Sequence, residues 1–192
     1  SRIWEVDIES RELRQITPEE PMASYRDAIY GADGQTLYIT SDRGGEFVKL
    51  HEVSLEDEEP SWRPLTEAID WNVEQIALSH DSRTLALTTN EDGYSVLRLL
   101  NTQTRALSES PTELPRGLMR SLQFARATRT LGFTLASPTR TNDAYTLTLD
   151  TGELHRWTES EIGGLNPDSF IEPTLFRYPT HDEREIPAFY YR

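Results

Sequence analysis

The sequence predicts an all-β fold: a partial β-propeller of about three and a half four-stranded antiparallel blades, followed by a C-terminal hairpin. Three observations predict it, namely a repeat, a set of turns in phase with that repeat, and short strands with apolar centres. The first turn of the repeat follows a run of alternating apolar residues, and its successive copies lie 47, 45 and 49 residues apart, at Glu9, Glu56, Asn101 and Asp150. A period of this length is typical of a propeller blade.

Two further turns recur in each period. The second is followed by a Thr-Leu pair that begins a strand, and it lies at 33–37, 81–85 and 126–131. Asp suits such a corner because its side chain bonds its own backbone, and Gly accepts a positive φ without a Cβ clash. The third turn is expected at 42–45, 90–93 and 141–143. Three turns per period separate four strands, which make one blade.

The strands after the second turn indicate burial between stacked blades. Threonine occupies both ends of each segment and mostly apolar residues the middle, in 36–40, 84–88 and 130–134. Such runs suit strands that are covered on both faces. Because no stretch combines helical length with a 3.6-residue apolar period, we expect almost no helix, with at most one helical turn at Asn166-Pro167.

The predicted domain organisation is asymmetric. Residues 1–158 form the partial propeller, residues 159–172 a connector, and residues 173–192 the hairpin. Within the propeller we expect an outer half blade at 1–17 and full blades at about 25–66, 70–108 and 117–158. Propellers protect their strand edges by closing into a ring, which three and a half blades do not do. We therefore expect the missing blades to come from an absent segment of the same protein or from a second copy of the chain.

Composition sets broad limits on function. The 192 residues are 36% hydrophobic and 27% charged, as in a globular protein, and their formal net charge is −14. Since nucleic acids and anionic membranes are bound by clustered Lys and Arg, neither is an expected partner. No apolar run is long enough to cross a bilayer. The first residues do not have the pattern of a secretory leader, but because the first blade is incomplete we expect this to say little about location. The compartment stays open, with a soluble protein expected and the cytoplasm slightly favoured.

No catalytic, cofactor or metal site is predicted within the chain. No serine has glycine at both positions of a Gly-x-Ser-x-Gly elbow, the four histidines lack metal-binding spacing, and cysteine is absent. The acidic segments 56–59 and 90–93 lack the ordered spacing of a calcium loop. We therefore expect no catalytic residue, no cofactor and no metal in this chain.

Several segments carry a resemblance to a known family. Residues 37–47, 85–95 and 154–165 resemble the propeller of prolyl oligopeptidase family serine peptidases, and are most similar to the branch with acylaminoacyl peptidases and dipeptidyl peptidases. Residues 172–192 resemble the hairpin with which the α/β-hydrolase domain of that family begins, and this junction is the more specific signal. The sequence departs from the family pattern at 126–129 and 182–184, where the family favours Asp-Gly turns.

The resemblance implies that the propeller caps a Ser-Asp-His hydrolase and filters peptide substrates, with the catalytic triad outside this chain. It also implies that the loops 42–46, 90–93 and 138–143 share one rim of the ring. On that rim, the residues expected to touch substrate or the partner domain are Arg43, Glu46, Glu91 and Asp92. Arg pairs with a peptide carboxylate, and a carboxylate accepts an N-terminal ammonium.

Two alternatives remain open on the sequence alone. The four rim residues can equally be solvated turn residues with no ligand. The whole chain can be a non-enzymatic propeller that binds protein partners, because a fold does not fix a function.

Overall fold

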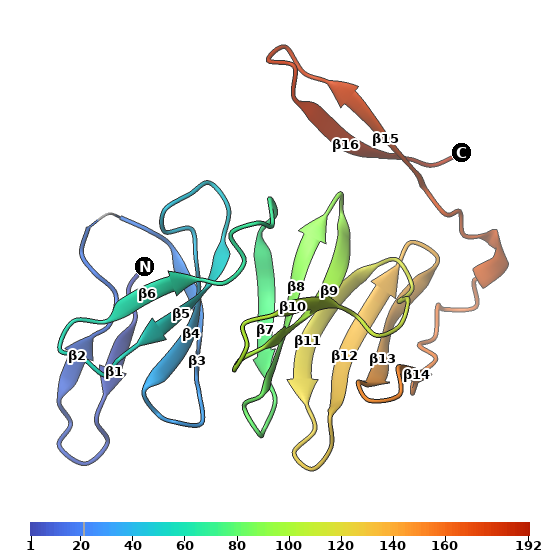
Figure 1. Cartoon of the computed structure of the whole chain (residues 1–192). Helices are drawn as coiled ribbons and strands as arrows, with labels where there is room; N and C mark the ends of the chain where they lie inside the picture. Colours follow the sequence, from blue (N-terminus) through green and yellow to red (C-terminus); the bar gives the residue numbers. More distant parts are fainter. Residues whose placement is uncertain (21) are drawn as a thin grey trace.

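The computed structural model describes residues 1–20 and 22–192 and confirms the predicted fold class. Within these residues the chain forms three four-stranded antiparallel sheets and two two-stranded sheets. Figure 1 shows the sheets standing side by side as blades of an open arc, with the C-terminal hairpin above one rim. The helical content of the described residues is one 3₁₀ turn, η1 (Pro167–Ser169), at the predicted place. No helix in this part of the chain is long and apolar enough to span a membrane.

The strands follow one another in chain order within each sheet. The half blade consists of β1 (Trp4–Val6) and β2 (Leu13–Gln15). The first full blade consists of β3 (Tyr25–Tyr30), β4 (Thr36–Ser41), β5 (Lys49–Ser54) and β6 (Ser61–Pro64). The second consists of β7 (Val73–Leu78), β8 (Thr84–Glu91), β9 (Tyr94–Asn101) and β10 (Leu107–Glu109).

The third full blade consists of β11 (Leu118–Phe124), β12 (Thr130–Ser137), β13 (Arg140–Thr148) and β14 (Glu153–Arg156). The hairpin consists of β15 (Thr174–Pro179) and β16 (Glu185–Tyr190). The division at residues 158 and 172 into propeller, connector and hairpin stays a prediction.

The turns between strands follow from local chemistry. The Asp33 carboxylate accepts hydrogen bonds from the amides of Gln35 and Thr36, both at 2.9 Å, and thereby closes the β3–β4 corner. The β8–β9 turn has two central residues with positive φ, Asp92 at 52° and Gly93 at 87°. Two positive φ values in a two-residue turn match the right-handed twist of the flanking strands.

One predicted turn is wrong. The expected turn at 141–143 lies inside β13, and the chain reverses earlier, at Pro138-Thr139. Asn142-Asp143 looks like a turn signal in sequence, but the Asp143 side chain is 1% exposed and pairs with Arg156 of β14. Asp143 therefore forms a buried ion pair and does not form part of a turn.

The core lies between neighbouring sheets in three clusters. Leu37 and Ile39 pack toward the half blade, against Ile16; Leu85 and Leu87 pack against Tyr38 of the preceding blade. Leu131 and Phe133 of the third blade pack against Ala86 and Leu97 of the second. Each fully buried Leu, Ile or Phe contributes about 1.5–3 kcal/mol relative to exposure, so these contacts hold the blades together.

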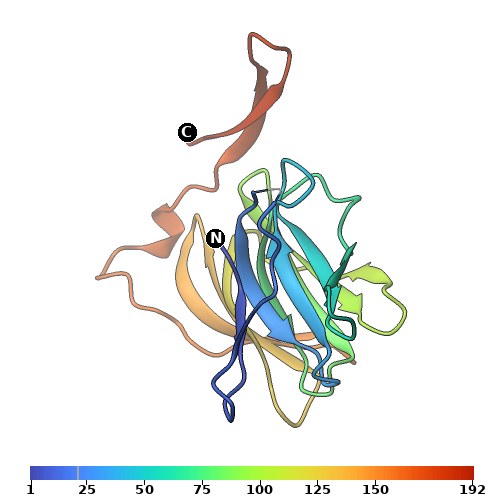
Figure 2. The same ribbon diagram turned by 90° about the vertical axis from the view of Figure 1, so that its left-hand side faces the viewer.

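The first strands of the three blades converge. β7 lies beside both β3 and β11. In Figure 2 the yellow-green fourth strand β10 lies at the right-hand edge of the molecule, away from these first strands. In a propeller the strands that converge surround the central channel. β3, β7 and β11 therefore form the axial wall, which is the name used below for these three strands.

Candidate functional site

The axial wall presents charged residues at one repeat position. The side chains of Arg26, Glu74 and Arg120 are exposed. Each of them follows a buried residue, namely Tyr25, Val73 and Met119. The strand pleat turns successive side chains to opposite faces, which separates the buried anchor from its charged neighbour.

A register shift of the β-bulge kind occurs at this position in each of the three full blades. The register shifts between Tyr25 and Ala28, between Val73 and Gln75, and between Arg120 and Gln123. A bulge bends its strand and redirects a side chain, and bulges are over-represented next to active sites. In the third blade the bulge includes Ser121, whose φ of 57° lies in the left-handed region that few non-glycine residues adopt.

Threonines of the second strands bond to two of these bulges. The Asp27 amide donates to Thr40 Oγ1 at 3.0 Å, and Thr134 Oγ1 donates to the Arg120 carbonyl at 3.4 Å. These side chains satisfy backbone groups that the irregular ladder leaves unpaired. The backbone next to two of the charged residues is therefore held in place by hydrogen bonds.

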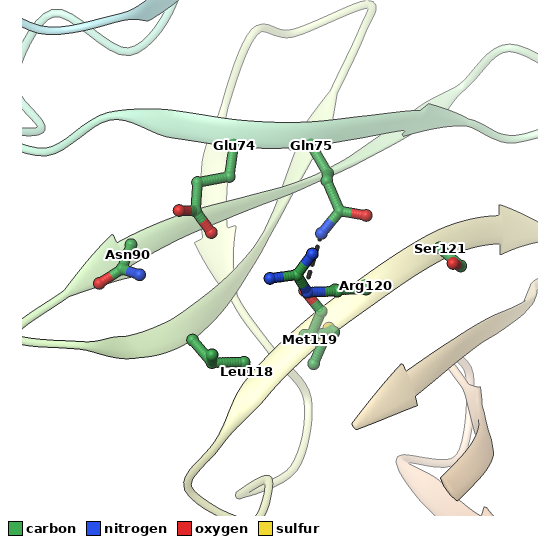
Figure 3. Close-up of a pocket in the computed structure, with 7 residues that line it drawn as sticks. All are labelled: Glu74, Gln75, Asn90, Leu118, Met119, Arg120 and Ser121. Carbon is green, nitrogen blue, oxygen red and sulfur yellow. Dashed lines mark hydrogen bonds between the residues drawn. The ribbon is translucent and has the colours of Figure 1, made fainter. Parts of the chain in front are cut away.

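A cavity of about 520 Å³ opens between the second and third blades on this wall. Figure 3 shows Glu74 and Gln75 of β7, Asn90 of β8, and Leu118 to Ser121 of β11 around it. Gln75 Nε2 donates to the Met119 carbonyl at 2.7 Å and ties the two inner strands together across the blades. A carboxylate, a guanidinium and two amides around an apolar floor suit the polar main chain of a peptide.

The rim residues Glu46 and Asp92 both contact the hairpin. The Asp92 carboxylate pairs with the guanidinium of Arg177 on β15. Glu46 Oε1 lies 3.7 Å from Arg184 Nη1, with both side chains largely exposed. An exposed pair of this kind contributes little, about 0–1 kcal/mol, so the Asp92 contact is the more important one. Whether either residue touches substrate or a further domain stays a prediction.

The side chain of Glu91, beside Asp92, forms its hydrogen bonds within its own sheet. Its Oε1 accepts hydrogen bonds from Arg98 Nη1 at 2.6 Å and from Thr89 Oγ1 at 2.7 Å. Burial alone would raise the pKa of Glu91, but these hydrogen bonds outweigh it and lower that pKa below its usual value.

Arg43 is turned into the first blade. Its guanidinium carbon lies 4.8 Å from the ring centroid of Trp62, in a cation–π contact. Its Nη1 atom is buried and has no hydrogen-bond partner within the described residues, and the same holds for Tyr25 Oη and His51 Nδ1 near the same ring. Burial lowers the pKa of His51, and the nearby Arg43 charge lowers it further. The role of Arg43 toward a substrate stays a prediction.

The hairpin is seated on the β8–β9 turn. The Tyr94 and Phe189 rings meet edge to face with centroids 5.1 Å apart. A Cβ added at Gly93 would lie 2.6 Å from Phe189 Cε2, which is closer than any real contact. Glycine is therefore required at position 93 for two reasons: the turn needs a positive φ, and the hairpin approaches too closely for a Cβ.

Sequence reasoning missed the axial wall and the seat of the hairpin. The alignment of Arg26, Glu74 and Arg120, with spacings of 48 and 46 residues, was available in the repeat itself. The pairing of Asp92 with Arg177 joins residues 85 positions apart and has no local signal. The described residues hold no cluster of three or more metal-ligating side chains.

Comparisons with known proteins give a fold and no sequence family. No protein-family model matches the chain, and no curated protein matches it. Among solved structures, prolyl oligopeptidase B from Galerina marginata, bound to a 25mer macrocyclization substrate, is similar over 98% of this chain, with a TM-score of 0.79 and 18% identity. A puromycin-hydrolyzing peptidase from Mycobacterium tuberculosis is similar over 98%, with a TM-score of 0.75 and 18% identity.

A puromycin hydrolase is similar over 93% of the chain, with a TM-score of 0.72 and 19% identity. The chain spans only about a quarter of these structures, at 26%, 28% and 27% of their respective lengths. At such identities the likeness concerns the fold. The resemblance predicted from the sequence is confirmed at that level: the chain has the fold of a propeller segment of prolyl oligopeptidase family structures.

Proposed function

We propose that the chain is the later part of the propeller, with the junction hairpin, of a serine peptidase of the prolyl oligopeptidase family. In this proposal the propeller caps a hydrolase domain that carries the catalytic triad, and it filters peptide substrates. Residues 1–158 supply the blades, 159–172 the connector and 173–192 the start of the hydrolase domain. The remaining blades belong to the same protein or to a second copy of the chain.

The two-faced hairpin is the observation that carries this proposal. One face, with Leu175 and Phe189 paired across the strands, lies toward the β8–β9 turn. The other face presents large side chains with exposed fractions of 45%, 45%, 40% and 55% at Phe176, Tyr178, Ile186 and Tyr190. A lone two-stranded hairpin is marginal in water, and a contiguous apolar patch marks a surface that another element covers.

The extent of the structural likeness supports the same proposal. The likeness to a peptidase solved with a substrate extends over 98% of the chain, so it includes the connector and hairpin as well as the blades. A propeller of an unrelated function would share the blades alone. The interaction-module alternative has no comparable observation in its favour.

Filtering is supported by the position of the charged residues. Arg26, Glu74 and Arg120 stand on the axial wall, where a peptide entering the channel would pass them. The channel of a ring admits an extended chain and excludes a folded protein on size alone. Polar groups beside an apolar floor then add affinity for the peptide main chain.

The experiment compares the protein with its native flanking sequence against residues 1–192 alone. The account predicts that the longer protein hydrolyses short peptides and leaves a folded protein of the same cleavage sequence intact, while residues 1–192 hydrolyse neither. Inhibitor-sensitive peptide turnover by residues 1–192, or equal cleavage of folded and short substrates by the longer protein, would contradict the proposal.

A further inference from the structure

A second cavity, of about 350 Å³, lies on the rim that carries the hairpin. It is formed by the segment that leads into β11, the β12–β13 turn with the adjoining strand ends, β14, and Glu172, which precedes the hairpin. Its charged side chains are Arg116, Arg140, Arg156 and Glu172, and its aliphatic hydroxyls are those of Ser137 and Thr139. We call it the arginine pocket. Three guanidinium groups around one cavity are notable in a chain with 33 acidic and 19 basic residues.

Arg156 is held in place by a buried carboxylate. Its Nε and Nη2 donate to Asp143 Oδ2 at 3.1 and 2.6 Å. Asp143 Oδ1 accepts from Thr158 Oγ1 at 2.9 Å and from the Ser160 amide at 2.8 Å. The Asp143 side chain is 1% exposed, so the guanidinium is fixed before any ligand arrives. No hydrogen bond from Arg156 Nη1 occurs among the described residues.

Arg116 and Arg140 have no carboxylate within 4.0 Å in the part of the chain that the structure describes. The guanidinium carbon of Arg116 lies 5.9 Å from the Tyr94 ring centroid. Both arginines are exposed. Their positive charge is therefore available to an anion from outside the chain.

We propose that the arginine pocket binds a carboxylate of a peptide, either its C-terminal group or an acidic side chain. Arg116 and Arg140 can each pair with a carboxylate through two parallel hydrogen bonds, and Arg156, which Asp143 already holds, has Nη1 left to donate one more. The hydroxyls of Ser137 and Thr139 can donate to the same group, while Leu135 and Tyr145 give the rest of the peptide an apolar wall. The choice of a peptide as ligand rests on the proposed function.

Glu172 opposes this ligand. Its carboxylate lines the same cavity and makes no ion pair with the three arginines among the described residues. Two negative charges in the same cavity repel each other, so Glu172 weakens the binding of a second carboxylate. Replacing it by the uncharged isostere therefore strengthens binding, whereas removal of an arginine weakens it.

Calorimetric titration of residues 1–192 tests the site without any catalytic readout. The probes are an acetylated tetra-alanine with a free C-terminus, its C-terminal amide, and an amidated peptide with one internal Glu. We expect at least one carboxylate-bearing peptide to bind about tenfold more tightly than the neutral amide, equivalent to about 1.4 kcal/mol. Preference for the free C-terminus identifies the end of the peptide as the ligand, and preference for the internal Glu identifies an acidic side chain.

Variants assign the binding to the pocket. Arg140→Ala should lose about tenfold in affinity for the preferred peptide, and Glu172→Gln should gain about two- to fivefold. Arg126→Ala is the matched control, because Arg126 is exposed in the β11–β12 turn on the opposite rim. The control should bind as the unchanged protein does.

Equal affinity for acid and amide peptides would overturn the carboxylate site while leaving the peptidase proposal untouched. Absence of binding by all three peptides would overturn it as well. Loss of affinity in Arg126→Ala equal to that in Arg140→Ala would show that net charge, and not this pocket, governs binding. The hydrolysis experiment described above decides the proposed function separately.

Discussion

Asp143 shows how a single residue connects two strands and the connector. Its carboxylate accepts hydrogen bonds from Arg156, Thr158 and Ser160, which lie in or directly after β14. Burial alone would raise the pKa of Asp143, but these hydrogen bonds outweigh it and lower that pKa to about 2. A carboxylate with this many partners is part of the structure of the blade.

Replacing Asp143 by alanine should destabilise the chain by about 2–4 kcal/mol, because it leaves the Arg156 charge and a backbone amide without a partner. Urea unfolding monitored by tryptophan fluorescence measures the change. Asp150→Ala is the control: Asp150 pairs with Arg129 at 2.7 Å with 59% of its side chain exposed, and should cost about 0–1 kcal/mol. Equal effects of the two substitutions would contradict the role given to Asp143.

The same residue gives the stability of the chain a pH dependence. Its pKa of about 2 in the folded chain lies below the ordinary value of 3.8, so folding favours the ionised form. The stabilisation is complete above pH 3.8 and is lost as the pH falls from 3.8 toward 2. Between pH 5 and 2, the free energy of unfolding should fall more steeply in the unchanged protein than in Asp143→Asn. Parallel curves would contradict the assignment, since other carboxylates are common to both proteins.

At the scale of elements, the blades were predictable and the seat of the hairpin was not. Asp33 and Gly93 mark corners through rules that act over a few residues, so their turns are readable in sequence. The bulge at Ser121 carries no such mark, because serine has no preference for positive φ. Asp143 misled the prediction of a turn because Asp serves corners and ion pairs equally well.

The candidate site was predicted only in part, for a related reason. Glu46 and Asp92 were expected on the rim, and the structure places both against the hairpin. Their partners Arg184 and Arg177 lie far along the chain, and only the packing of the hairpin on the ring brings them near. The arginine pocket likewise collects residues from separate segments spread over positions 115 to 172, which no local pattern links.

Gly93→Ala tests the seat of the hairpin. The new methyl group would meet Phe189, and the φ of 87° is strained for alanine. We expect a loss of about 1–3 kcal/mol and faster hydrogen exchange in β15 and β16. Gly34→Ala is the control, because its φ of 66° is similarly strained but nothing lies within 4 Å of the added Cβ.

The control Gly34→Ala should lose about 1 kcal/mol and leave exchange in the hairpin unchanged. The difference between the two variants isolates the contact with Phe189. Unchanged hairpin exchange in Gly93→Ala would contradict the seat described here.

At the scale of the whole molecule, the arc has an uncovered apolar end. Trp4, Val6 and Leu13 of the half blade are 50%, 56% and 64% exposed. Their counterparts in the third blade include Tyr145 and Leu147, which are buried against the second blade at 7% and 0%. The half blade therefore presents a face that a neighbouring blade covers in a closed ring.

Residues 1–192 alone should self-associate through this face. Sedimentation velocity should show a concentration-dependent shift to larger species, because a contiguous apolar patch is covered when copies meet. Val6→Thr combined with Leu13→Thr should move the distribution toward monomer, while Val96→Thr, in the second blade, should not. A monomer at all concentrations would contradict the open end.

The central claim places the catalytic serine outside residues 1–192. Labelling of the protein with its native flanking sequence by a fluorophosphonate, followed by intact-mass measurement and peptide mapping, tests it most directly. The account predicts one label per molecule, on a serine beyond residue 192. A label on any serine within residues 1–192, or no label at all, would contradict it.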